Sequence, residues 1–407
     1  MGAVNKKMKI KIKENLIYLI FALILGVVVG AIDALFGRGL LWITDIRGKY
    51  ILPLVIFLPA AGLFITWMYH HFNEESLKGM TLVLETVQGK RDSIPLALIP
   101  LVMLGTWITH LFGGSAGREG VAVQIGATLS HGAARKLHLP CDERILLIAG
   151  MSAGFGGLFQ TPFAAVFFAM EVIVAGKMAY EAFLPAIVAA FTASEVSHVL
   201  GLEKFQVPVK AGFTLSNPKT FFWLILFGIV FGITGKIFAV FLKNTKAFMA
   251  SKITNPYKRI GLVSIPLAIC LLIMWNGRYC GLGTNLISQS FGDGEIFTFD
   301  WVLKLVFTVI TLSIGFQGGE VTPLFSIGAS LGFILGQIAG ISPAACAALG
   351  YAAVFGSATN TVIASFLIGI EVFGADNALA FLLVCSIAYI VNGGSCIYGA
   401  QQKSKFL

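Results

Sequence analysis

The feature that most constrains the fold of this chain is a succession of long apolar segments that carry almost no charge. Of the 407 residues, 57% are hydrophobic and only 12% are charged, about half the charged share of an ordinary soluble domain. The mean hydropathy is +0.86. A soluble fold of this length could not enclose so many apolar side chains, so the composition predicts an all-α polytopic membrane protein.

The apolar segments are unequal in length. A helix needs about 20 residues to cross the hydrocarbon layer, yet several segments are shorter and end at polar breaks such as 160–162 and 357–360. Irregular backbone survives at membrane depth only where protein or water satisfies its polar groups. We therefore expect broken helices around a buried site. The expected segments are 16–36, 51–69, 93–112, 144–159, 162–175, 182–200, 220–243, 260–275, 302–316, 321–341, 345–357, 361–373 and 378–398.

The chain also contains an internal repeat. Shifted by 200 residues, Gly150–Val172 matches Gly350–Val372 at eight of 23 positions, including Glu171 with Glu371. A shift of 202 residues matches 117–130 with 319–332 at five of 14 positions. Two matches in the same order at nearly the same shift indicate duplicated halves, and transporters place their site where such halves meet. The expected division is a basic N-terminus at 1–15, a first repeat at 16–200, a linker at 201–219, a second repeat at 220–398 and a short tail at 399–407.

The formal net charge of +9 is concentrated beside the apolar segments. This positive-inside pattern predicts a multi-pass protein of the inner or plasma membrane with a cytoplasmic N-terminus, and it argues against nucleic acid as a partner. Acidic residues in the region 293–300 are expected outside. The basic clusters are Lys6, Lys7, Lys9, Lys11 and Lys13, then Lys243, Lys246, Lys252, Lys258 and Arg259; the acidic residues are Asp293, Glu295 and Asp300.

In the register of the repeat, each half presents a glycine-flanked loop that carries an acid. Arg118 and Glu119 fall opposite Glu320 and Val321, and an apolar helix is expected after each loop. The start of a helix offers free N–H donors and a positive dipole end to an anion. A neighbouring glutamate could occupy such a site as a tethered anion and leave when protonated. The alternatives are that Glu119 pairs with Arg118 or faces the aqueous end of a span.

A second pair of acids repeats between the halves. Glu171 and Glu371 each end an apolar segment, which favours a structural helix cap or a salt bridge over a transport role.

The sequence resembles the CLC family of anion channels and transporters along its whole membrane part. GREG at 117–120 is similar to the family's GREGP loop, whose glutamate gates the pathway and moves protons, so the resemblance assigns those roles to Glu119. KGMT at 78–81 falls where the family has GSGIP, and GGEVTP at 318–323 where it has GxFxP. NGGSCIYGA at 392–400 resembles the segment with the central tyrosine, here Tyr398. The resemblance implies a CLC-like inverted repeat and a homodimer with one pathway per subunit.

The departures from the family pattern resemble its bacterial fluoride-exporting branch. Met80 replaces the serine that contacts chloride, Val121 replaces the proline of GREGP, and Glu320 stands within the GxFxP loop. Val172 stands where many chloride/proton exchangers carry an internal glutamate, so Glu320 is the candidate to replace that acid or to contact the anion. The implied anion route consists of Met80, Glu320, Val321, Thr322 and Tyr398, with Gly117, Arg118 and Gly120 as the supporting loop.

The resulting expectation is a fluoride/proton antiporter in a lipid bilayer, with no metal, cofactor or nucleotide. A passive CLC-type channel and a chloride/proton exchanger are the near alternatives. A remote alternative is an intramembrane serine hydrolase, because Gly113–Gly117 matches G-x-S-x-G around Ser115. Such a hydrolase requires a base within reach of Ser115, and His110 is the histidine nearest to it in sequence.

Overall fold

The computed structural model describes residues 2–404 except 211 and 293, with side chains described from residue 14 onward. The N-terminal basic cluster from Lys6 to Lys13 and the acidic Asp293 therefore lie outside the described side chains, as do residues 405–407 of the expected tail.

The described part of the chain is a helical protein, which confirms the expected fold class. Its helices are α1 (Gly2–Lys49), α2 (Ile51–Ile56), α3 (Leu58–Phe72), α4 (Met80–Val87), α5 (Leu98–Leu111), α6 (Glu119–Lys136), α7 (Glu143–Phe159), α8 (Pro162–Glu171), α9 (Phe183–Val199), α10 (Pro218–Lys252), α11 (Pro256–Ile273), α12 (Thr284–Phe291), α13 (Asp300–Ile314), α14 (Val321–Ala339), α15 (Pro343–Thr359), α16 (Val362–Phe373) and α17 (Ala378–Asn392). Short 3-10 turns are η1 (Glu74–Lys78), η2 (Tyr180–Ala182) and η3 (Ala375–Asn377). Two short strands, β1 (Val174–Ala175) and β2 (Gln402–Lys403), pair in parallel.

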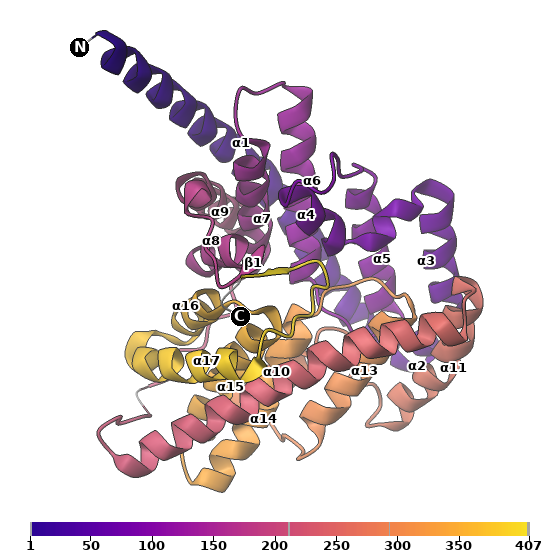
Figure 1. The fold of residues 1–407 in the computed structure, drawn as a ribbon. Helices are drawn as coiled ribbons and strands as arrows, with labels where there is room; N and C mark the ends of the chain where they lie inside the picture. Colours follow the sequence, from indigo (N-terminus) through magenta and orange to yellow (C-terminus); the bar gives the residue numbers. More distant parts are fainter. Residues whose placement is uncertain (1, 211, 293, 405–407) are drawn as a thin grey trace.

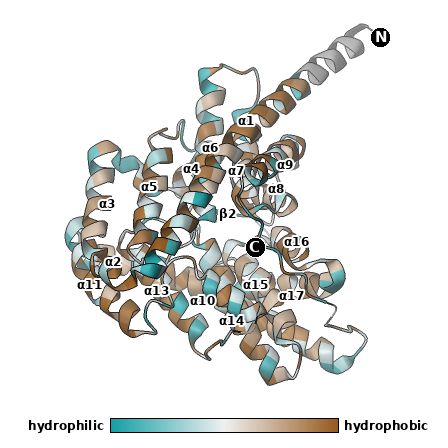
Figure 2. Cartoon of the chain, turned by 180° about the vertical axis from the view of Figure 1, so that it is seen from behind, coloured by the Kyte–Doolittle hydropathy of each residue, from teal (hydrophilic) through white to brown (hydrophobic). Residues whose placement is uncertain are grey.

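Six of the described helices are long and apolar enough to cross a membrane, α1 and α10 being the longest. Several others are much shorter, as the polar breaks predict: the ten residues of α8 span about 15 Å, half of a hydrocarbon layer. The expected segment at 51–69 is divided between α2 and α3 at Phe57. Figure 2, coloured by residue hydropathy, shows mostly hydrophobic residues along the described part of α1 and along α16 and α17, and a hydrophilic stretch on α10.

The two halves are built alike and occupy different regions of the molecule (Figure 1). Helix α6 begins at Glu119 and α14 at Val321, the same shift of 202 residues that the repeat predicts. Helices α7 and α15 then end at Gln160 and Asn360, and both of these residues adopt the left-handed conformation. The repeat in sequence is therefore a repeat of backbone geometry.

Glycines allow the central helices of each half to approach closely. A Cβ atom at Gly126 of α6 would overlap the carbonyl oxygen of Gly150 of α7, and one at Gly328 of α14 would overlap that of Gly350 of α15. Small residues at such crossings are typical of helix packing in membranes. The equivalent glycines are among the residues that match in the repeat.

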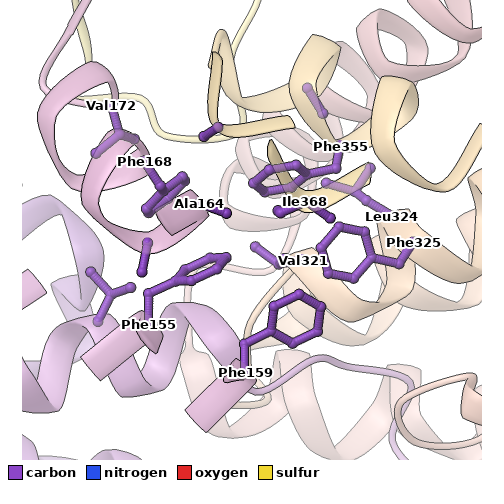
Figure 3. Packing of buried hydrophobic residues seen from close by; sticks show 14 of the residues in the cluster. Phe155, Phe159, Ala164, Phe168, Val172, Val321, Leu324, Phe325, Phe355 and Ile368 are labelled. Carbon is purple, nitrogen blue, oxygen red and sulfur yellow. The ribbon is translucent and has the colours of Figure 1, made fainter. Parts of the chain in front are cut away.

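Phenylalanines from both halves meet in the core between them (Figure 3). The repeat-equivalent Phe155 and Phe355 lie with ring centroids 6.5 Å apart, and Phe168 packs against both at 4.9 and 5.9 Å. Phe325 of α14 extends the cluster to Phe355 at 5.1 Å. This dry core joins the halves directly behind the loops that precede α6 and α14.

Candidate anion site

The two glycine-flanked loops of the repeat lie against each other. The backbone N–H of Gly117 donates to the carbonyl of Gly319 at 2.5 Å, and the N–H of Gly319 donates to the carbonyl of Gly117 at 2.8 Å. A Cβ atom at Gly319 would lie 3.0 Å from the backbone nitrogen of Gly120. The antiparallel bridge therefore needs small residues, and it brings the first turns of α6 and α14 to one place.

Glu119, the first residue of α6, reaches across to the other half and binds the start of α14. Its Oε2 accepts hydrogen bonds from the backbone N–H of Thr322 at 3.1 Å, from the hydroxyl of Thr322, and from the backbone N–H of Arg118 at 3.3 Å. The side chain is 1% exposed. The side chain of Glu119 thus lies at the N-terminal end of α14, where free N–H groups and the helix dipole favour a negative charge.

The ion pair between Glu119 and Arg118, which the sequence offered as an alternative, is only a minor contact of Glu119. The Arg118 Nε lies 3.6 Å from Glu119 Oε1, beyond the usual hydrogen-bond length. Within the described structure, Oε1 of Glu119 and both Nε and Nη1 of Arg118 are buried without hydrogen-bond partners. The carboxylate is therefore held through one oxygen and by the other half of the protein, and its burial excludes the aqueous end of a span.

Glu320 lies on the opposite side of the same junction. It immediately precedes α14, and a Cβ atom added at Gly120 would be 3.7 Å from its Oε2. Among the described residues, its own backbone N–H is the hydrogen-bond donor found for its carboxylate. Val321 and Thr322 follow it as buried residues of the first turn of α14.

Met80, Glu320 and Tyr398 line one cavity of about 440 Å³, whereas Glu119, Val321 and Thr322 are buried beyond its lining. Met80 begins α4 after a left-handed Gly79. The Tyr398 hydroxyl is buried, and no partner for it occurs among the described residues. The residues predicted to form the anion route are thus divided between a cavity and the buried junction of α6 and α14.

The cavity also contains residues that sequence reasoning did not assign to the site. Lys78, Lys246 and Arg259 contribute three cations against the carboxylate of Glu320, and Gln124 of α6 contributes an amide. In the sequence, Lys246 and Arg259 belong to a basic cluster that indicates only which side of the membrane is cytoplasmic. Gln124 follows Glu119 by five residues in an apolar helix, a position that gives no signal of its own.

The repeated acids Glu171 and Glu371 are confirmed as helix caps, and each caps a helix of the other half. Glu371 accepts from the backbone N–H groups of Phe163 at 3.1 Å and Ala164 at 2.8 Å, at the start of α8. Glu171 accepts from Ile363 at 3.2 Å and Ala364 at 3.0 Å, at the start of α16. Val172, beside Glu171, is fully buried in the apolar core (Figure 3).

The environment of Ser115 rules out the nucleophile interpretation of G-x-S-x-G. Its Oγ is buried and lies 2.9 Å from both the Thr308 Oγ1 and the Lys304 Nζ. Lys304 also donates to the carbonyls of Tyr279 at 3.2 Å and Gly281 at 2.6 Å, so it serves as a hydrogen-bond donor. Both ring nitrogens of His110 are occupied by backbone carbonyls, those of Thr106 and Ala116. Ser115 is therefore a structural residue of the loop.

Known proteins resemble this chain over nearly its whole length. A 35% identical relative, the "Chloride/fluoride channel protein" of Pseudomonas syringae pv. tomato, matches over 95% of this chain and 86% of its own length. The "H(+)/Cl(-) exchange transporter ClcA" of Yersinia pestis is 25% identical over 95% of this chain and 87% of its own. The crystal structure of a CLC-type fluoride/proton antiporter superimposes with a TM-score of 0.94 at 47% identity, covering 96% of this chain and 99% of that one. The family model for voltage gated chloride channels matches residues 61–393, and the chain is thus an integral membrane protein of the CLC family with its inverted-repeat fold.

Proposed function

We propose that this protein exports fluoride in exchange for protons, with Glu119 as the gate and proton carrier. The observation that carries the proposal is the position of the Glu119 carboxylate on the N–H and hydroxyl of Thr322. Those two donors and the positive end of α14 suit a small hard anion as well as they suit a carboxylate. Fluoride and Glu119 therefore compete for one place.

Protonation of Glu119 couples this competition to proton movement. A neutral carboxyl has less attraction for a helix N-terminus and for the donors that it now fills. When Glu119 takes a proton and leaves, fluoride can occupy the donors of Thr322. When fluoride departs, the deprotonated carboxylate returns, so each anion that passes is linked to a proton.

The charges of the cavity fit a cytoplasmic vestibule for the anion. Lys78, Lys246 and Arg259 outnumber Glu320, and a cleft with one sign of charge concentrates the opposite ion. With the N-terminus and the junction of α10 and α11 at Lys243–Arg259 on the cytoplasmic side of the inner or plasma membrane, this cavity collects fluoride from the cytoplasm. Met80 and Tyr398 line its path to Val321 and Thr322, and Glu320 takes part in proton or anion movement.

The supporting loop gives the gate its freedom and its position. Gly117 fixes the bridge between the halves, Gly120 leaves room beside Glu320, and Arg118 faces the free oxygen of Glu119. The division into repeats at 16–200 and 220–398, with a linker at 201–219, belongs to the same proposal. So does a homodimer with one pathway per subunit, which crosslinking in the membrane would test.

Transport by purified protein in liposomes tests the function. Vesicles loaded with potassium fluoride are followed with a fluoride electrode and an internal pH dye under an imposed pH gradient, with chloride in a parallel set. Uphill fluoride movement that is lost in Glu119→Gln is the expected result. Fluoride flux that only dissipates its own gradient would indicate a passive channel, and chloride flux as fast as fluoride flux would indicate a chloride/proton exchanger.

A further inference from the structure

The side-chain amide of Gln124 lies in the cavity that holds Met80, Glu320 and Tyr398. Gln124 is on α6, five residues after Glu119, and lines this cavity while being only 6% exposed. Helix α6 therefore begins with Glu119, the proposed gate. Little more than one turn later, the same helix places the amide of Gln124 in the adjoining cavity.

This amide has no hydrogen-bond partner within the described part of the protein. Its Oε1 is buried and unpartnered, and no hydrogen bond of its Nε2 is found there either. A buried polar group without a partner is costly. Gln160 and Gln401 avoid that cost: Gln160 donates to the carbonyl of Leu202 at 2.5 Å, and Gln401 to those of Val172 and Thr359 at 3.0 and 2.8 Å. Gln289 also has a buried Oε1 without a partner among the described residues, but it does not line this cavity.

The amide faces the turn that carries Met80. A Cβ atom at Gly79 would lie 3.1 Å from the Oε1 of Gln124 and 3.6 Å from its Nε2. Because no hydrogen bond fixes the amide, rotation about its last bond can present the NH₂ group to the cavity. A larger residue at position 79 would obstruct that rotation, and Gly79 also has a φ of +49°, a conformation that favours glycine.

The residue beside this amide, Met80, lacks a hydrogen-bond donor for an anion in the cavity. A methionine thioether offers no hydrogen-bond donor, so Met80 cannot hold an anion in the way a hydroxyl would. The Tyr398 hydroxyl is likewise without a partner, and Gln124 adds two N–H donors on the side of Met80. We propose that Gln124 donates a hydrogen bond to fluoride in the cavity and is a specificity-determining residue of the anion route, an inference that rests on the proposed function.

The size and hardness of the anion explain the selectivity. Fluoride is smaller than chloride and a stronger hydrogen-bond acceptor, so it gains more from a neutral amide donor after losing its water. The cations Lys78, Lys246 and Arg259 attract both anions alike. The cations therefore concentrate anions, and the amide with the tyrosine hydroxyl distinguishes between them.

Replacement of Gln124 by methionine, which has a similar length and no donor, tests the inference in the liposome assay. We expect the ratio of fluoride to chloride transport to fall about tenfold, the effect of losing one hydrogen bond to a charged group. Gln124→Asn keeps an amide, and we expect it to retain more of the fluoride preference than Gln124→Met. Gln124→Leu, which also lacks a donor, is the second variant if the methionine variant does not fold.

Gln317→Met is a matched control, because Gln317 lines the same cavity but its amide is already engaged with Tyr69 at 3.3 Å and Gly315 at 3.2 Å. We expect it to change both anions' rates alike. An unchanged fluoride/chloride ratio in a folded donor-free variant, Gln124→Met or Gln124→Leu, would overturn the inference while fluoride transport by the wild type stands. Wild-type protein that moves chloride but no fluoride would overturn the proposed function and the inference together.

Discussion

Replacement of Glu371 by glutamine tests whether the crossed helix caps hold the two halves together. The carboxylate of Glu371 accepts from Phe163 at 3.1 Å and Ala164 at 2.8 Å through different oxygens. A glutamine can accept only one of these bonds, and its NH₂ group then faces the other backbone N–H. The change also removes a negative charge from the positive end of α8.

The loss can be estimated from these two effects. An N–H group left without an acceptor costs roughly 1–3 kcal/mol, and the lost charge at a helix N-terminus adds about 0.3–1 kcal/mol. We expect Glu371→Gln to lower the free energy of unfolding by about 2–3 kcal/mol. Glu171→Gln removes the equivalent cap from α16 and should have a similar effect.

Reversible unfolding in mixed micelles measures the free energy of unfolding, and transport in liposomes shows whether the folded fraction still works. The matched control is Glu195→Gln, because Glu195 is exposed on α9 and makes no ion pair or hydrogen bond with the described residues. It should change stability by less than about 0.5 kcal/mol. Cap variants as stable as Glu195→Gln would refute the reasoning.

Two further predictions concern close packing and the gate. Gly328→Ala should lower the free energy of unfolding by more than about 2 kcal/mol, because its Cβ would overlap the carbonyl oxygen of Gly350. The control is Gly48→Ala, since a Cβ at Gly48 meets nothing within 4 Å. Equal stability of the two variants would contradict the prediction. Thr322→Val should lower the number of protons moved per fluoride, because Glu119 keeps the backbone N–H but loses the hydroxyl donor. Simultaneous fluoride-electrode and pH-dye records measure this ratio. A ratio equal to that of the wild type would contradict the prediction.

The repeat made part of the site predictable from the sequence. Matching 117–130 with 319–332 placed two glycine loops in equivalent positions, and α6 and α14 begin within those loops at equivalent residues. The short segments and polar breaks likewise predicted partial-span helices. These properties depend on local composition and spacing, which a sequence records directly.

The crossing of side chains between the halves could not be predicted in this way. Nothing in the repeat indicates that Glu171 caps α16 rather than its own half, because that requires the relative placement of the halves. The short helices α4 and α12 have eight residues each, too few for a clear apolar period. Gln124 looks like an isolated polar residue until the fold sets it beside Met80.

The crossed pair Glu171 and Glu371 and the single crossed acid Glu119 differ in how completely their carboxylate oxygens are hydrogen-bonded. Each carboxylate oxygen of Glu171 and Glu371 accepts a backbone N–H. Glu119 uses one oxygen and leaves the other without a partner in the described structure, and its counterpart position in the repeat is Val321. The same geometry of an acid on the other half's helix thus allows two uses: full pairing fastens the halves, and, under the function proposed above, partial pairing lets Glu119 yield its place to an anion.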